Sequence, residues 1–223
     1  MPSLTLPDIL LNAVLLLPPL IFAITLHEVA HGWVAKQFGD ATALLAGRIT
    51  LNPVKHVDPV GTIIVPLGLY YFTQGQFTFG WAKPVPVAFN NLRNPRRDMI
   101  LVAAAGPASN FLMALGWAVI SAIIILLGLW DSVPGRLIAQ MCGHGIRFNV
   151  LLAVFNMLPV PPLDGGRVLA GLLPARAAMV LDRIEPFGII IVLVLVMTPL
   201  LGAIIGPPLS FFMRFFQGLA GFN

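Results

Sequence analysis

The sequence His27-Glu28-Val29-Ala30-His31 brings two imidazoles and a carboxylate together inside a strongly apolar stretch. On a helix, residues four apart share a face, so His27 and His31 can bind one metal ion. Glu28 lies beside them, where it can take a proton from a water on that ion. Zinc suits this ligand set, because it binds imidazole and carboxylate and can keep one position open. The pattern predicts one Zn²⁺ per chain, with His27 and His31 as ligands and Glu28 as general base.

A zinc site needs more than two protein ligands. A metzincin-type continuation is absent, because Val34 and Gln37 stand where Gly and His would be required. Asp164 is the favoured third ligand, since prolines end the apolar stretch before it and Gly165-Gly166 let the chain turn toward another helix. It could instead cap a helix starting at Gly165 and pair with Arg167. The full set of candidates is Asp40, His56, Asp58, Asp164, Asp182 and Glu185.

The composition indicates the kind of protein that must position these groups. Of the 223 residues, 58% are apolar and 10% are charged, whereas soluble domains average about 45–50% and about 25%. The sequence therefore predicts an all-α polytopic membrane protein whose partner is the lipid bilayer. A disordered chain and a nucleic-acid-binding domain are excluded, and Cys142 as the only cysteine excludes an intrachain disulfide.

Four apolar stretches are long enough to be full spans, although the pattern allows up to six. The first contains Pro18-Pro19, which should kink the helix or start a new one. The last contains three prolines and can be one bent span or a span plus an interfacial helix. The predicted spans are residues 9–38, 99–130, 148–163 and 188–216.

Between the first two spans, the sequence predicts a short element of another kind. Residues 61–72 are apolar but short for a span, so we expect a re-entrant segment. Residues 76–87 alternate apolar and other side chains, which indicates a strand or β-hairpin that Pro84 and Pro86 confine to a sheet edge. The predicted fold is a helical bundle with this re-entrant or β-hairpin insertion.

The distribution of Lys and Arg gives the orientation only if residues 61–72 do not cross the membrane. In that case ten basic residues lie on the side that carries the chemistry and three on the other side. Such an asymmetry is typical of a cytoplasmic face. We therefore expect a multi-pass protein of the cell (inner) membrane with its active site nearer the cytoplasmic face.

Two motifs at opposite ends of the chain carry a family resemblance. The early His27-Glu28-x-x-His31 and the late Asn156-x-x-Pro159-x-Pro161-x-Leu163-Asp164-Gly165 resemble the site-2 protease family of intramembrane zinc metalloproteases. Three further stretches are similar to its compact bacterial branch: Asn52-Pro53 with His56-Val57-Asp58-Pro59-x-Gly61-Thr62, Gly80-Trp81-Ala82-Lys83-Pro84-Val85-Pro86-Val87 and Ala105-Gly106-Pro107-x-x-Asn110.

The resemblance implies His27, His31 and Asp164 as zinc ligands, Glu28 as the general base, and Asn156 as an active-site residue that steadies the oxyanion. It implies a single membrane-embedded metalloprotease domain over residues 1–223, in which we expect no room for the PDZ or CBS domains of other members. The expected activity is hydrolysis of a peptide bond within or near a transmembrane segment of a substrate protein.

The alternatives are an ion or proton transporter, a catalytically inactive homologue that binds membrane partners, and another membrane protease such as a prenyl-protein endopeptidase. Three further polar residues are ambiguous in the sequence. Asn110 is expected to fix helix packing and His56 to hold a turn, whereas Arg167 can order Asp164 or bind lipid phosphate. The substrate's identity and the oligomeric state are not encoded in any pattern that we find.

Overall fold

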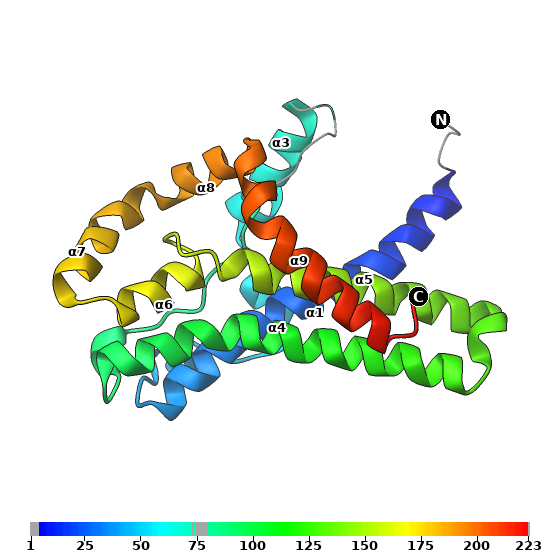
Figure 1. Cartoon of the computed structure of the whole chain (residues 1–223), viewed down its shortest axis with the longest axis horizontal. Helices are drawn as coiled ribbons and strands as arrows, with labels where there is room; N and C mark the ends of the chain where they lie inside the picture. The colour runs from blue at the N-terminus through cyan, green and yellow to red at the C-terminus, as the bar shows by residue number, and fades with distance from the viewer. Residues whose placement is uncertain (1–4, 73, 75–79, 223) are drawn as a thin grey trace.

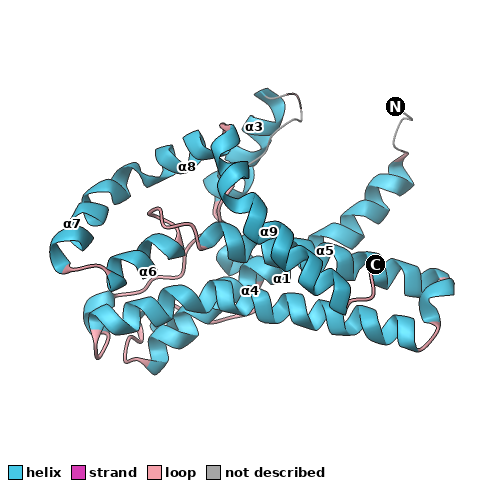
Figure 2. Cartoon of the chain, viewed as in Figure 1, coloured by secondary structure: helices cyan, strands magenta, loops and turns pink. Residues whose placement is uncertain are grey.

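The computed structural model describes residues 5–72, 74 and 80–222, and this part of the chain is almost entirely helical (Figures 1 and 2). Four of the described helices are long and apolar enough to cross a membrane, which confirms the expected number of full spans. These are α1 (Leu6–Gln37), α4 (Pro95–Leu126), α5 (Val133–Asn156) and α9 (Pro199–Leu219). The described chain is therefore an all-helical membrane protein.

The remaining described elements are short helices that connect or flank the four long ones. They are α2 (Thr42–Leu45), η1 (Pro53–His56), η2 (Pro59–Ile64), α3 (Val65–Phe72), η3 (Phe89–Asn91), η4 (Leu129–Asp131), α6 (Asp164–Leu172), α7 (Ala175–Ile184), η5 (Glu185–Phe187) and α8 (Gly188–Val196). Figure 1 shows α7 and α8 arching away from the bundle, whereas α6 lies along α4.

The third span differs from the sequence prediction. Helix α5 begins at Val133, not near residue 148, because the Ser132 side chain caps its first turn by accepting from the Gly135 amide. Of the two alternatives for Pro18-Pro19, no new helix starts there, because α1 continues through both residues. The last apolar segment contains two helices, α8 and α9, with Pro199 opening the second; this agrees with a span plus a further helix, whose interfacial position stays a prediction.

The predicted insertion between the first two spans is not confirmed in detail. Residues 59–72 form the consecutive helices η2 and α3, and their re-entrant course stays a prediction. Of the predicted hairpin, residues 76–79 lie outside the described residues, and residues 80–87 form no strand. Pro84 and Pro86 explain this outcome, because neither has a backbone N–H to donate to a ladder.

The core lies where α4 packs between α1 and α5. Small side chains line this contact and allow the backbones to approach closely. The buried cluster between α4, α5 and α9 includes Ala114, Ala118, Ile146, Val150 and Phe216. A second cluster, with Ala35, Leu92 and Val102, joins the end of α1 to the beginning of α4. Helix α4 is thus in contact with every element that carries a predicted zinc ligand.

Candidate metal centre

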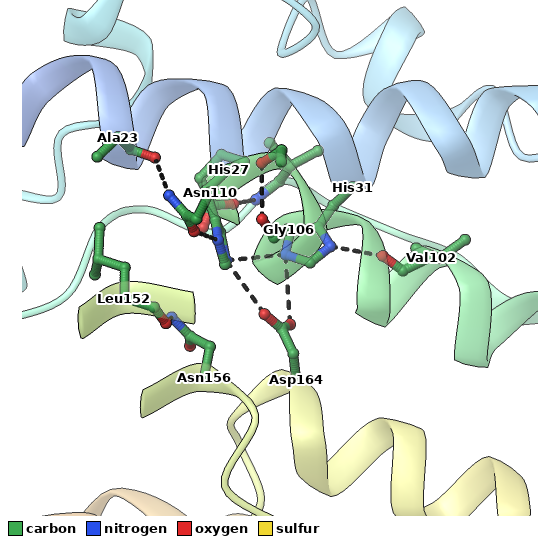
Figure 3. Close-up of polar contacts among 12 residues, drawn as sticks. Ala23, His27, His31, Val102, Gly106, Asn110, Leu152, Asn156 and Asp164 are labelled. Atoms are coloured by element: carbon green, nitrogen blue, oxygen red, sulfur yellow. Dashed lines mark hydrogen bonds and ion pairs between the residues drawn. The ribbon is translucent and has the colours of Figure 1, made fainter. Parts of the chain in front are cut away.

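Helix α1 and the first residue of α6 bring three predicted ligands to one point against α4 (Figure 3). The Nε2 atoms of His27 and His31 are 3.1 Å apart. The Asp164 carboxylate reaches both rings, with Oδ2 3.2 Å from His27 Nε2 and Oδ1 3.4 Å from His31 Nε2. All three residues are largely buried. Among the residues that the structure describes, this is the one cluster of His, Cys, Asp and Glu able to hold a metal ion.

The spacing of these atoms fits zinc. Two ligand atoms that each bind zinc at about 2.0–2.1 Å with tetrahedral geometry lie about 3.3 Å from each other. The two imidazole nitrogens are 3.1 Å apart, and each lies 3.2 or 3.4 Å from one oxygen of the Asp164 carboxylate, so each pair of groups is at about this separation. In addition, Oδ2 of Asp164 is buried and has no hydrogen-bond partner in the described chain. A bound cation would offset the cost of burying this oxygen without a hydrogen bond.

Nδ1 of each imidazole is held by a group on α4, so Nε2 is the nitrogen that faces the three-residue cluster. Nδ1 of His31 lies 2.7 Å from the carbonyl oxygen of Val102, which can only accept, so this nitrogen carries the proton. Nδ1 of His27 lies 2.6 Å from Oδ1 of Asn110. With both Nδ1 atoms protonated in the neutral rings, both Nε2 lone pairs point at the Asp164 carboxylate. Three electron-rich groups facing one another need a cation between them.

The orientation of Asn110 is itself fixed by its neighbours. Its amide nitrogen donates to the carbonyl of Ala23 at 3.1 Å and to Oδ1 of Asn149 at 2.9 Å, so its oxygen must face His27. Asn149 in turn donates to the carbonyl of Gly145 at 2.8 Å. Both asparagines are fully buried. These hydrogen bonds, which connect two asparagine side chains to the carbonyls of Ala23 and Gly145, thus set the tautomer of His27, a predicted zinc ligand.

Asn149, which the sequence analysis did not single out, holds Asn110, and Asn110 contacts His27 in addition to the packing role expected of it. The available signal was an asparagine in an apolar stretch, where an unpaired amide is costly. Gly106, also on α4, completes the arrangement. A Cβ at that position would lie against Nε2 of His31 and Cε1 of His27, so only glycine lets the helix pass beside the two rings.

Asp164 reaches the histidines because the chain folds back on itself after α5. Gly165 and Gly166 pack against the backbone of residues 157–161, too closely for any side chain. The alternative ion pair between Asp164 and Arg167 does not form in the structure. The Arg167 guanidinium lies 3.7 Å from Oε1 of Glu185 and 5.3 Å from the centre of the Phe89 ring.

The other candidate ligands lie elsewhere or are engaged in other contacts. Asp58 accepts the amides of Val60 and Gly61 at the start of η2. His56 is buried, with Nε2 2.9 Å from the carbonyl of Thr50, as expected of a residue that holds a turn. Glu185 pairs with Arg167 and Asp40 binds Thr42, Ala88 and Asn91. The side chain of Asp182 lies outside what the structure describes.

The two predicted catalytic residues have different surroundings. Glu28 is half-buried on α1, and its Oε2 accepts the backbone N–H of Val85 at 2.8 Å. Asn156, at the end of α5, donates to the carbonyl of Leu152 at 3.0 Å and lies on the Asp164 side of the cluster in Figure 3. Neither side chain bonds to the three ligand residues in the described structure. Their roles in a reaction stay predictions.

Comparison with known proteins supports the family resemblance that the sequence motifs carry. Residues 135–199, which contain Asp164 but not the HExxH motif, match the family model described as Peptidase family M50. The protein named "Putative zinc metalloprotease YwhC" of Bacillus subtilis is 38% identical over 199 residues, which cover 86% of this chain and 84% of that protein.

Two proteins named "Putative zinc metalloprotease Rip2" are more distant relatives. The one from Mycolicibacterium smegmatis is 29% identical over 81% of this chain and 66% of its own length. The one from Mycobacterium tuberculosis H37Rv is 30% identical over 80% and 65%. No solved structure gives a significant match. With this degree of identity over most of the YwhC chain, and the expected ligand residues gathered at one point, the chain belongs to peptidase family M50, the site-2 protease family, in its compact form.

Proposed function

We propose that this chain is an intramembrane zinc endopeptidase that hydrolyses a peptide bond within or near a transmembrane segment of a membrane protein. The observation that carries the proposal is the cluster itself. Two imidazoles and a carboxylate lie at zinc-ligand spacing among helices long enough to cross a membrane, and Glu28 follows His27 on the same helix. Residues 1–223 act as one membrane-embedded domain.

The residues divide the work of hydrolysis. A zinc ion held by His27, His31 and Asp164 would supply Lewis-acid chemistry, which polarises water and a carbonyl. Glu28 takes a proton from the attacking water and passes it to the leaving nitrogen of the cleaved bond. The Asn156 amide, once released from Leu152, donates a hydrogen bond to the developing oxyanion.

The location of the site restricts the substrate. A helical segment hides its carbonyls in its own hydrogen bonds, so a substrate must unwind locally, and helix-weakening residues near the cleaved bond favour this. If residues 61–72 do not cross the membrane, ten basic residues lie on one side of it and three on the other. This distribution supports a multi-pass protein of the cell (inner) membrane that cuts its substrate nearer the cytoplasmic face.

The two other function classes are less well supported. A proton transporter would also place His, Glu and Asp among membrane helices. It gives no reason for both imidazoles to point their lone pairs at one carboxylate at zinc spacing. An inactive homologue gives no reason to keep a carboxylate at position 28.

The test uses the purified full chain in mild detergent, with zinc content and cleavage of a transmembrane substrate as separate readouts. We expect about one zinc per chain in the parent and in Glu28→Gln, but cleavage only in the parent. Asp164→Ala should lose most of its zinc. Glu185→Ala is the matched control, because it removes a carboxylate that was also a candidate ligand but pairs with Arg167 instead. A folded parent without stoichiometric zinc would refute the proposal and favour the transporter.

A further inference from the structure

Residues 81–88, here called the strap, form neither helix nor strand, lie beside α1 at Val85 and lead into η3. The strap is held by backbone hydrogen bonds to elements that are distant in sequence. Trp81 N donates to the carbonyl of Gly61 at 3.0 Å, and Lys83 N donates to the carbonyl of His56 at 2.9 Å. The next backbone N–H along the strap, that of Val85, donates to Glu28.

The sequence Pro84-Val85-Pro86 leaves a single backbone donor in three residues, because proline has no N–H. That donor, the amide of Val85, lies 2.8 Å from Oε2 of Glu28. Residues before proline are confined to extended conformations, so Lys83 and Val85 cannot turn this N–H away by becoming helical. The two prolines therefore present one amide in a fixed direction.

The Val85 side chain fixes the strap against α1 one turn beyond Glu28. Val85 is only 7% exposed. A Cβ added at Gly32 would lie only 3.0 Å from Cγ1 of Val85. Ala43 crowds the same position at 3.0 Å. Because Gly32 has no side chain, the strap can lie close to α1, and the Val85 amide can reach Glu28.

Both ends of the strap have anchors that do not involve Glu28. The Arg48 guanidinium is buried and donates to the carbonyl of Lys83 at 2.8 Å. At the other end, the Ala88 amide donates to Oδ2 of Asp40 at 2.7 Å. Asp40 is fully buried and is held in turn by Thr42 and Asn91. The position of the Val85 N–H is therefore set by other groups before Glu28 binds it.

We propose that the strap positions the general base: the Val85 N–H holds Oε2 of Glu28, so that Oε1 is the oxygen that takes the proton from water. In the described chain, Oε1 has no hydrogen bond, whereas Oε2 has this one. A carboxylate anchored by a charge-assisted hydrogen bond keeps one orientation instead of sampling several rotamers. The inference rests on the proposed protease function, and Val85 acts as a positioning residue.

The contact can be tested without activity, by measuring amide hydrogen exchange at single-residue resolution in the purified full chain. Glu28→Ala should accelerate exchange at Val85 and leave Ala88 protected. Asp40→Ala should accelerate exchange at Ala88. Unchanged protection of Val85 in Glu28→Ala would show that the carboxylate does not bind this amide, and would overturn the proposal.

The functional role can be tested by removing one N–H and nothing else. Replacing Val85 with its α-hydroxy acid analogue exchanges the N–H for an ester oxygen and keeps the side chain. We expect kcat to fall about 10- to 100-fold, the loss typical of a hydrogen bond to a charged group, with KM and zinc content unchanged. The matched control is the same replacement at Val87, which also follows a proline but whose N–H makes no hydrogen bond in the described structure. It should leave kcat unchanged.

The outcomes separate the two proposals. If the parent cleaves substrate and the Val85 replacement has the kcat of the parent, the role of the strap is wrong and the protease function stands. If both replacements raise KM and leave kcat unchanged, the strap contacts substrate and does not position Glu28. If the zinc-loaded parent cleaves no substrate, the protease function is refuted and the role of the strap falls with it.

Discussion

Replacing Asn110 with alanine tests whether the amide network sets the zinc affinity. The side chain makes three buried hydrogen bonds: it accepts from His27 Nδ1 at 2.6 Å and donates to the Ala23 carbonyl and Asn149 Oδ1 at 3.1 and 2.9 Å. Alanine leaves His27 Nδ1 and Asn149 Oδ1 unpaired, whereas the Ala23 carbonyl keeps its place in the hydrogen-bond ladder of α1. Removing the residue that orients a metal-bound imidazole typically lowers metal affinity about 10- to 100-fold, or about 1.4–2.7 kcal/mol.

Zinc affinity and fold stability must be measured separately, because the same substitution affects both. Each buried group left without a partner costs about 1–3 kcal/mol, so the two groups that Asn110→Ala leaves unpaired should lower the free energy of unfolding by at least about 2 kcal/mol. Zinc affinity is measured by competition with a chromophoric chelator in detergent, and stability by thermal unfolding of the zinc-free protein. Ser121→Ala is the matched control on the same helix. Ser121 is fully buried and donates to the carbonyl of Ala220 at 3.0 Å, far from the site.

A second variant distinguishes orientation of the ligand from general destabilisation. Asn110→Asp can still accept from His27 Nδ1 but can no longer donate to Ala23 or Asn149. It should lose stability and keep its zinc affinity within a few-fold of the parent, since a carboxylate orients a zinc-bound histidine well. If Asn110→Ala binds zinc as tightly as Ser121→Ala does, Asn110 does not position His27 and the reasoning is refuted.

Two further predictions follow from the close contact at α4 and from the anchor of the strap. Gly106→Ala should abolish stoichiometric zinc binding, because its Cβ would lie against both imidazoles, whereas Gly116→Ala on the same helix should leave zinc content unchanged, because its Cβ would meet nothing within 4 Å. Burial alone would raise the pKa of Asp40, but hydrogen bonds, first among them those from Thr42, hold it below its ordinary value. The folded-state pKa is thus below the unfolded one, and the stabilisation by Asp40 is present above about pH 4 and is lost as the pH falls through the folded-state value. The protection of the Ala88 amide, taken as its exchange rate relative to the intrinsic rate at the same pH, should decrease in that acid range, and Asp40→Asn should not show this loss of protection.

The three residues of the cluster were predictable because each belongs to a local pattern. His27 and His31 share a helix face by their spacing alone, and Asp164 follows prolines and precedes two glycines. The groups that orient them were not predictable. Val102 acts through its backbone carbonyl, 71 residues from His31 in sequence, and Asn110 is 83 residues from His27. Backbone donors and acceptors carry no signature in the sequence, so only the packing of α4 against α1 assigns them.

The error in the third span has a related cause. Residues 135–147 include glycine, arginine, glutamine and histidine, which lower the hydropathy and resemble a loop. In the structure this stretch is the first half of α5, and a Cβ on Gly145 would lie against the Trp117 ring of α4. Glycine there permits close helix contact and does not mark a turn. A single sequence cannot separate these two uses of the residue.

The three residues of the cluster differ in how the rest of the protein holds them. Both imidazoles are fixed from behind by α4, through the Val102 carbonyl and the Asn110 side chain, so their positions do not require the metal. Asp164 has no such support, because its Oδ2 is buried without a hydrogen bond in the described chain. Helix α6 is attached to α4 at its other end, where Arg96 donates to the carbonyls of Gly171 and Leu173. The first turn of α6 is held instead by the contact of Gly165 and Gly166 with the backbone of residues 157–161. A bound zinc would add a further link, from Asp164 to a pair of histidines that α1 and α4 already orient.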